Sequence, residues 1–334
     1  MNVFELTRAL VDIPSVTEDE RAVAEFLERY LAELARSTSG AVERLPVTAD
    51  RWNVFACWGT PVITLSTHMD VVPPWFASSE DDGRIFGRGA CDAKGIIAAM
   101  IVAARELLAE GHRNLGLLFV VGEERNSAGA YAAARQPRGS RFLINGEPTE
   151  NKLALGSKGS LRYELIARGR MAHSAYPHLG DSAIEKLLNA LSEVRALPLP
   201  SHPTLGPGTL NIGTISGGRA PNVIPDEARA ELLIRLVDDG ASTAAAIRHI
   251  AERAGIEARQ VLSVPAVHLE SLPGFATGVV AFTTDIPAFA GSWGKPLLIG
   301  PGSILVAHTT EEHIAKSDLV SAVNIYKQLV TQLS

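Results

Sequence analysis

The chain has 334 residues, more than one hydrophobic core usually serves, so we expect two domains. Its 46% hydrophobic and 20% charged content is typical of a globular protein and excludes a largely disordered one. The net charge of −6, with no basic run carrying interleaved aromatic residues, argues against nucleic-acid binding.

Cysteine content and hydropathy indicate where the protein works. The two cysteines, Cys57 and Cys91, are too few for a disulfide framework and suit a reducing compartment. Residues 1–21 lack the long apolar segment of a signal peptide, and no run of about 18 apolar residues occurs anywhere. We therefore predict a cytoplasmic protein without a membrane span.

Outside residues 157–265, helical and strand-like patterns alternate along the chain, which is typical of an α/β fold with a central, mostly parallel sheet. A break at residues 13–17 separates the first two helical patterns. Helices are predicted at residues 3–10, 22–34, 94–110 and 128–135. Continuous apolar runs predict buried strands at residues 62–67, 115–121, 142–144 and 297–299.

After Gly156 the pattern changes to the order β-α-β-β-α-β, which is that of a ferredoxin-like α+β domain. The predicted strands are 161–167, 209–216, 228–236 and 261–264, and the helices are 182–196 and 241–254. Because an apolar strand with a following histidine comes later, we expect this domain to be inserted into the first. The predicted boundaries are 1–156 and 266–334 for the catalytic domain and 157–265 for the insertion.

Predicted buried strands run into residues that bind metals or transfer protons. Open α/β sheets build their sites beyond the carboxyl ends of their strands, so we expect these residues to converge on one metal site. They are, in chain order, His68 and Asp70, Glu123 and Glu124, Glu147, and His308.

His68 and Asp70 follow the strand predicted at 62–67. A neutral imidazole can bind zinc through one nitrogen while a carboxylate orients its other N–H. Asp70 is close enough in sequence to act nearby, although the exact partner stays open. Taken alone, the pair is equally well explained by a loop histidine beside an exposed aspartate.

Asp92 ends the stretch Gly-Arg-Gly-Ala-Cys-Asp, which begins like a dinucleotide-binding loop. Because Asp92 stands where the third glycine of that motif belongs and the preceding strand is weak, we reject nucleotide binding. Asp92 also precedes the helix predicted at 94–110, where aspartate is a common N-cap. Beside the other ligands, a carboxylate shared between two metals is favoured.

Glu123 and Glu124 follow the apolar run Leu-Leu-Phe-Val-Val-Gly. Adjacent residues at a strand end project in different directions, so one can bind metal while the other faces the attacking water. Two neighbouring glutamates are usually a solvated turn, but the apolar run weakens that reading. If they converge with Asp92 and Glu147, the site carries four negative charges. Two Zn²⁺ ions balance these charges, whereas one Zn²⁺ ion leaves an uncompensated repulsion.

The sequence lacks the known motifs of single-zinc proteases and serine hydrolases. His308 and His313 flank Thr-Thr-Glu-Glu, and this spacing matches neither H-E-x-x-H nor H-x-x-E-H. There is no G-x-S-x-G motif, so a serine hydrolase is not predicted. The remaining histidines in polar or loop contexts are interpreted as surface or packing residues: His112, His202, His249 and His268.

Taken together, the motifs resemble the acetylornithine deacetylase / succinyl-diaminopimelate desuccinylase family of di-zinc deacylases and metallopeptidases. The resemblance covers nearly the whole chain and rests on IPSVTEDE, THMDVVPP, GRIFGRGACDAKG, VVGEER, NGEPTE, GRMAHSAYPHLGDSAI, NIGTISGGRAPNVIPDEARAELLIR and GPGSILVAHTTEEHI. It implies a zinc-peptidase-like catalytic domain with an inserted lid and dimerisation domain. It also implies two Zn²⁺ per subunit, with Co²⁺ as a possible substitute.

The resemblance assigns roles in the metal site. It implies Glu123 as general base, with Asp70 beside His68. The implied ligands are His68 and Glu147 on one zinc, Glu124 and His308 on the other, and Asp92 bridging both.

In the inserted domain, the resemblance implies that His173, within AHSAYP, reaches the active site of the partner in a homodimer. An N–H donor there would stabilise the oxyanion. By position, Asn222 and Arg235 match family residues that hold the substrate carboxylate. Tyr176 is also expected to bind the substrate. The segment between Pro74 and Gly83 is shorter than is usual for the family, which bears on the shape of the substrate pocket.

We therefore predict a dizinc amidohydrolase that removes an acyl group from an N-acyl amino acid. The motif GPGSILVAH favours N-acetylornithine, and hence arginine biosynthesis. N-acetyl-lysine or succinyl-diaminopimelate comes second, and carboxypeptidase or dipeptidase activity third. A non-catalytic dimeric binding protein on the same fold is the alternative of a different class, and the intact ligand set counts against it.

Overall fold

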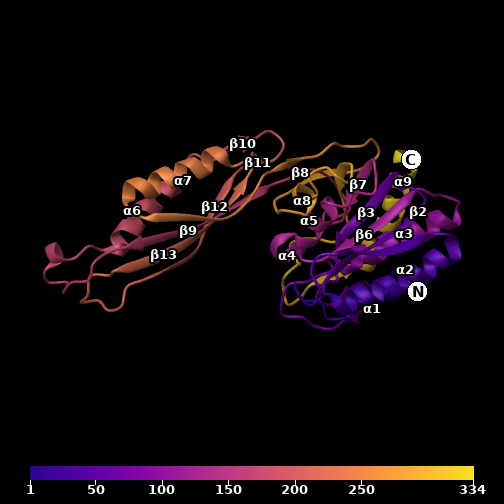
Figure 1. Cartoon of the computed structure of the whole chain (residues 1–334), viewed down its shortest axis with the longest axis horizontal. Coiled ribbons are helices and arrows are strands. Elements are labelled where there is room, and N and C mark those ends of the chain that lie inside the picture. Colours follow the sequence, from indigo (N-terminus) through magenta and orange to yellow (C-terminus); the bar gives the residue numbers. More distant parts are fainter. The chain divides into compact units, whose positions relative to one another are not determined.

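The computed structural model describes residues 1–334, which form two compact units. Unit 1 comprises Met1–Leu155, Leu269–Gly278 and Thr284–Ser334, and unit 2 comprises Gly156–His268 and Val279–Thr283. Figure 1 follows the chain through both units. None of the helices is both long and apolar enough to cross a membrane.

Unit 1 is built on a six-stranded sheet. In spatial order its strands are β1 (Ala41–Pro46), β2 (Trp52–Trp58), β6 (Leu115–Val120), β3 (Ile63–His68), β7 (Phe142–Asn145) and β17 (Lys295–Leu298). The last four run parallel to one another, whereas β1 and β2 pair antiparallel at one edge. The predicted α/β class with a mostly parallel sheet is confirmed, and the two antiparallel edge strands are an addition to it.

Helices cover both faces of this sheet, because alternate residues of a strand point to opposite faces. On β6, Leu117 and Phe119 join one apolar cluster, and Leu118 and Val120 join another. The first cluster contains residues of α1 (Val3–Val11), α2 (Arg21–Thr38), α3 (Lys94–Ala109) and α9 (Lys316–Leu333). The second contains residues of α5 (Ala128–Ala134) and α8 (Ile286–Phe289).

Helix α3 is buried almost all round, because it contacts the sheet on one side and α1 and α9 on the other. Helix α3 begins directly after the loop that carries Asp92, so the packing of the helix holds the end of this loop in place. The short helix α4 (Glu123–Asn126) follows β6. A small sheet of β4 (Ser79–Glu80), β5 (Arg84–Phe86) and β18 (His313–Ala315) completes unit 1.

Unit 2 has the predicted β-α-β-β-α-β order. Its elements are β9 (Gly159–Arg168), α6 (Ala183–Arg195), β12 (Thr209–Gly217), β13 (Glu227–Leu236), α7 (Ala241–Ala254) and β14 (Glu257–Val264). The strands form an antiparallel sheet in the order β12-β13-β9-β14, and Figure 1 shows α6 and α7 lying together beside it. This arrangement is ferredoxin-like.

The two faces of the sheet in unit 2 differ sharply. Along β13 buried residues alternate with less buried ones, and the buried set packs with α6 and α7. On the other face, charged residues of neighbouring strands form ion pairs, such as Arg162–Glu231 at 2.5 Å and Arg229–Glu164 at 3.3 Å. The remaining short elements are β8 (Leu153–Ser157), η1 (Pro177–Leu179), β10 (Ser201–His202), β11 (Gly206–Pro207), β15 (Val267–His268) and β16 (Thr277–Val280).

Candidate metal centre

The carboxyl ends of the parallel strands of unit 1 carry the predicted metal-binding residues. His68 is the last residue of β3, and Glu147 lies two residues beyond β7. Glu123 and Glu124 begin α4 after β6, and His308 lies in the loop after β17. Because parallel strands end at the same edge, these side chains gather there.

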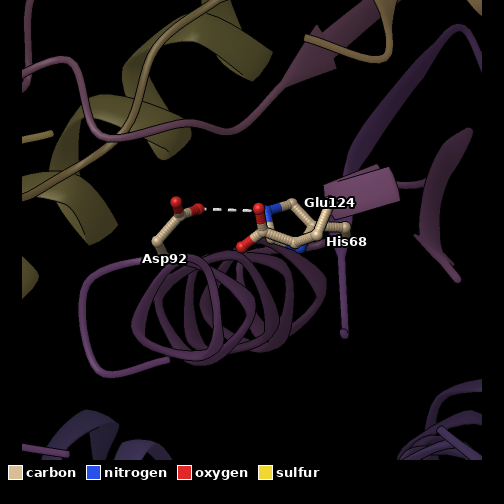
Figure 2. A group of neighbouring side chains, drawn as sticks. All are labelled: His68, Asp92 and Glu124. Carbon is tan, nitrogen blue, oxygen red and sulfur yellow. Dashed lines mark hydrogen bonds and ion pairs between the residues drawn. The ribbon is translucent and has the colours of Figure 1, made fainter. Parts of the chain in front are cut away.

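Three residues form a compact group of possible ligands. The ligand atoms of His68, Asp92 and Glu124 all lie within 4.8 Å of one another. Figure 2 shows these side chains turned toward one another, with Nε2 of His68 at 3.0 Å from Oδ1 of Asp92. His68 and Asp92 are buried, and the side chain of Glu124 is 7% exposed.

His308 completes the group from the loop after β17. Its Nε2 lies 3.0 Å from Oε1 of Glu124 and 3.3 Å from Oδ2 of Asp92. The two oxygens of Asp92 therefore face two different histidines, His68 and His308, which is the arrangement a bridging carboxylate requires. His308 has a φ of +64°, a backbone conformation that non-glycine residues adopt mainly where the surroundings impose it.

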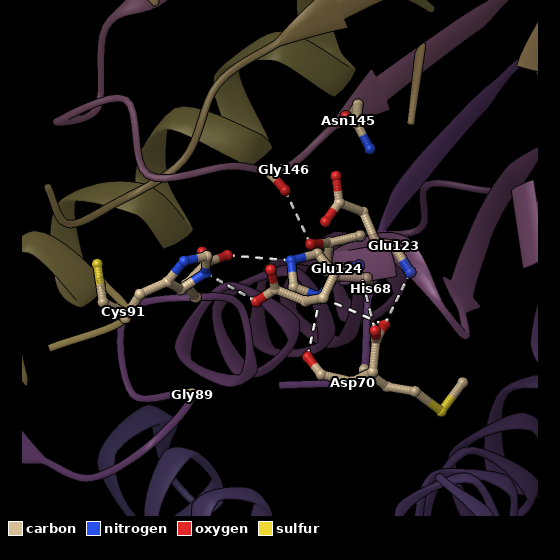
Figure 3. Close-up of polar contacts among 12 residues, drawn as sticks. His68, Asp70, Gly89, Cys91, Glu123, Glu124, Asn145 and Gly146 are labelled. Carbon is tan, nitrogen blue, oxygen red and sulfur yellow. Dashed lines mark hydrogen bonds and ion pairs between the residues drawn. The ribbon is translucent and has the colours of Figure 1, made fainter. Parts of the chain in front are cut away.

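Asp70 holds several parts of this site together. Nδ1 of His68 donates to the main-chain oxygen of Asp70 at 3.0 Å, which turns Nε2 toward Asp92 and the position a metal would take. The buried carboxylate of Asp70 accepts hydrogen bonds from the hydroxyl of Thr17 at 2.9 Å and from the backbone N–H of Glu123 and Glu124, at 3.1 and 3.2 Å. In Figure 3 Asp70 lies below these groups, with the dashed bonds converging on it.

The other carboxylates are held close together in a buried site. Burial raises the pKa of Glu123 well above its usual value, and the charge of Glu147 raises it further. Burial likewise raises the pKa of Glu147, and its Oε1 has no hydrogen-bond partner. Burial and, to a lesser extent, the neighbouring carboxylates thus disfavour the charged forms of Glu123 and Glu147, and a bound cation would favour them.

Charge pairing acts in the opposite direction on Asp92 and His308. Burial alone would raise the pKa of Asp92, but hydrogen bonds to His308 and His68 hold it below its usual value. Hydrogen bonds to Asp92 and Glu124 raise the pKa of His308 to about 10. The histidines thus offset the charge of the carboxylates, a role that bound metal ions would take over.

Asp285, which precedes α8, was not predicted as a site residue. It is 1% exposed, and neither carboxylate oxygen is within hydrogen-bonding geometry of a partner. Burial raises its pKa to about 7, and the charges of Asp70 and Glu124 contribute. No strand or motif leads into it, so no sequence pattern singled it out.

The donor set of imidazole nitrogens and carboxylate oxygens suits a divalent transition metal. The unpartnered Oε1 of Glu147 is the kind of buried acceptor that a cation would satisfy. Glu123 begins α4 together with Glu124, and Figure 3 shows its carboxylate turned toward Asn145 rather than toward the ligand group. Glu123 is not among the three residues whose possible ligand atoms lie together, His68, Asp92 and Glu124.

The predicted substrate residues lie in unit 2. His173 is exposed in the loop after β9 and pairs with Val223 in a short antiparallel bridge. The neighbouring Ser174 donates to the main-chain oxygen of Asn222 at 3.0 Å, so His173 and Asn222 lie on adjoining segments. Tyr176 is 58% exposed, with its ring 6.3 Å from that of His173. Arg235 is half-buried on β13, and burial lowers its pKa.

Comparison with known protein families finds a match for most of the chain. The profile of Peptidase family M20/M25/M40 matches residues 64–332. A peptidase M20 domain-containing protein of Schizosaccharomyces pombe is 38% identical over 98% of this chain and 84% of its own length. A probable carboxypeptidase of Aspergillus clavatus is 39% identical over 97% of this chain and 80% of its own.

Solved structures share the fold at lower identity. The aminopeptidase PepT of Bacillus cereus matches with a TM-score of 0.81 at 20% identity, over 99% of this chain and 98% of its own. YXEP of Bacillus subtilis, described as a dinuclear metal-binding peptidase, matches with a TM-score of 0.69 at 16% identity. That match covers 99% of this chain and 97% of YXEP.

Proposed function

Because this chain belongs to peptidase family M20/M25/M40, we propose that it releases the C-terminal residue from dipeptides or short peptides. Family membership makes it a metal-dependent hydrolase acting on amide bonds. The observation that carries the proposal is the placement of Asp92 between His68 and His308, with Glu123 beside the ligand Glu124. The preference for peptides follows the relatives named as probable carboxypeptidases.

We propose that the metals are two Zn²⁺, with Co²⁺ able to replace them. His68 and Glu147 would bind one ion and Glu124 and His308 the other, with Asp92 bridging, in agreement with the two histidines that Asp92 faces. When bound, such ions activate water and polarise the amide carbonyl.

Glu123 would carry the proton through the reaction. Its raised pKa lets the carboxylate accept a proton from the attacking water and release it later to the leaving amine. The backbone N–H groups of Glu123 and Glu124 both donate to the carboxylate of Asp70, which would hold the proposed base and the proposed ligand in fixed positions relative to each other. We propose that His173 donates an N–H to the oxyanion of a partner subunit's site, in a homodimer formed through unit 2.

Substrate selection would depend on a free carboxylate next to the scissile bond. Arg235 is suited to this because its guanidinium is half-buried and can bind a carboxylate through two parallel hydrogen bonds. Asn222 and Tyr176 would complete the contact. Removal of an acyl group from an N-acyl amino acid is the second candidate, since it needs the same carboxylate and the motif GPGSILVAH favours N-acetylornithine.

A substrate panel tests the proposal. The metal-loaded protein would be assayed with a dipeptide, the same dipeptide with an amidated C-terminus, N-acetylornithine, N-acetyl-lysine and N-succinyl-diaminopimelate. We expect the free dipeptide to be cleaved fastest and the amidated one to be resistant. Fastest turnover of N-acetylornithine would establish the second candidate, and equal cleavage of the amidated dipeptide would contradict carboxylate recognition.

A further inference from the structure

Glu312 is a buried carboxylate for which the proposed chemistry has no use. It lies four residues after His308, in the Thr-Thr-Glu-Glu stretch, and is 0% exposed. Its Oε1 accepts three backbone N–H groups, from Gly89 at 2.9 Å and from Cys91 and Asp92 at 3.2 Å each. Its Oε2 accepts from Nη1 of Arg88 at 2.6 Å.

We propose that Glu312 is a positioning residue that fixes the loop carrying Asp92, and thereby the affinity of the metal centre. The inference rests on the proposed dinuclear hydrolase function. Between β5 and α3 this loop contains no strand or helix, so it depends on such contacts for its shape. One oxygen of the Glu312 carboxylate accepts hydrogen bonds from three N–H groups of this loop, and the last of these N–H groups is that of Asp92 itself.

The backbone of the loop is adapted to wrap this carboxylate. Gly89 has a φ of +89°, and a Cβ there would lie 2.8 Å from Cγ1 of Val71. The N–H of Gly87 adds a bond of 3.0 Å to the main-chain oxygen of Glu312. A side chain at Gly89 would be strained at this φ and would collide with Val71, so glycine lets the loop keep the conformation in which its N–H reaches Glu312.

Glu312 also links two metal-binding segments. His308 and Glu312 belong to one short stretch of chain, and Asp92 contacts both through Oδ2 and its backbone N–H. The stretch from His308 to Glu312 therefore sets the distance between Oδ2 of Asp92 and Nε2 of His308, which is 3.3 Å. A displaced Asp92 would lose its fit to both histidines at once.

A purely structural role for Glu312, as the counter-charge of Arg88, makes a different prediction. Arg88 is also buried, and its Nε donates to the main-chain oxygen of Pro74 at 3.2 Å. Replacing Arg88 breaks the ion pair but leaves the three N–H bonds to Glu312. Glu312→Met removes both the ion pair and the acceptor of the three N–H groups, so Arg88→Met is its matched control.

The experiment is calorimetric titration of chelator-treated protein with Zn²⁺, together with thermal unfolding. We expect Glu312→Met to bind Zn²⁺ about 10–100-fold more weakly than the wild type, and Arg88→Met to lose less. The double variant Arg88→Met/Glu312→Met removes the unpaired charge of Arg88, so it should regain thermal stability without regaining Zn²⁺ affinity.

Three results would overturn the inference: wild-type affinity in Glu312→Met, equal losses in both single variants, or affinity that returns with stability in the double variant. If Glu312→Met does not fold, the double variant decides the matter by its affinity. Wild-type protein that binds no Zn²⁺ would instead overturn the proposed function, so the two failures are distinguishable.

Discussion

The carboxylate of Asp70 accepts the backbone N–H of Glu123 at 3.1 Å. The main chain of the same residue accepts from Nδ1 of His68, so a single aspartate orients a proposed ligand and fixes the start of α4. The proposed base and the metal centre are therefore coupled through Asp70, and a change there should affect both.

Asp70→Ala tests this coupling. The variant loses the acceptor for Thr17 and for the two N–H groups of α4, so we expect Zn²⁺ affinity to fall about 10–100-fold and kcat to fall as well. Thr17→Val removes only one of these bonds and should have the smaller effect on both. Calorimetry and steady-state kinetics measure them, and an unchanged kcat at saturating metal would contradict the coupling.

Glu123→Gln tests the proposed base. Removing a general base costs about 10²–10⁴ in rate, so we expect kcat to fall by that factor while metal content and thermal stability stay near wild-type values. Glu311→Gln is the control, because Glu311 is an exposed glutamate near His308. Near-normal turnover by Glu123→Gln would show that another group transfers the proton.

His173→Ala tests the proposed contribution of unit 2. Loss of an oxyanion donor should lower kcat about 10²–10³-fold with little loss of metal. His178→Ala is the control, because His178 is an exposed histidine of the short helix η1 that follows this loop. Mixing His173→Ala with Glu123→Gln subunits should restore activity, since one site of each heterodimer then has both residues. Heterodimers confirmed by mass that remain inactive would exclude a role across the subunit interface.

The pH dependence of the metal-free protein follows from Asp285. Its pKa is raised from 3.8 to about 7, so between these values the folded protein holds a proton that the unfolded chain has released. The free energy of unfolding therefore falls as pH rises through this window, by about 1.4 kcal/mol per pH unit for one group. Glu123 and Glu147, whose pKa values are also raised, act in the same direction.

Chelator-treated wild-type protein and Asp285→Asn would be compared by denaturant unfolding between pH 5 and pH 7. We expect the wild type to lose stability as pH rises and the variant to lose less of it, because its amide does not titrate. Parallel pH profiles for the two proteins would contradict the raised pKa of Asp285.

The sequence predicted the strands that position the site, because buried parallel strands are continuous apolar runs that end abruptly in polar residues. It therefore placed His68, Glu123 and Glu147 at one sheet edge. The edge strands β1 and β2 were missed, since β1 is largely exposed and Asn53 interrupts the apolar run of β2. Asn53 becomes satisfied only in the fold, by bonds to Val121 and Gly129.

The supporting residues of the site could not be predicted for a similar reason. Glu312 contacts a loop some 220 positions earlier in the chain, and no local pattern reports so distant a partner. Asp285 follows no strand and belongs to no motif, and only its burial beside the other carboxylates reveals it. Residue type and strand ends are local properties, whereas these contacts depend on the complete fold.

The central claim is that a dinuclear metal centre around Asp92 hydrolyses amide bonds. Its most direct test is titration of chelator-treated protein with Zn²⁺ while following dipeptide cleavage and bound metal together. We expect no activity without metal and a rise that ends at about two ions per chain, the number that balances the carboxylates. Full activity with a single tightly bound ion, and no gain from a second, would contradict the account.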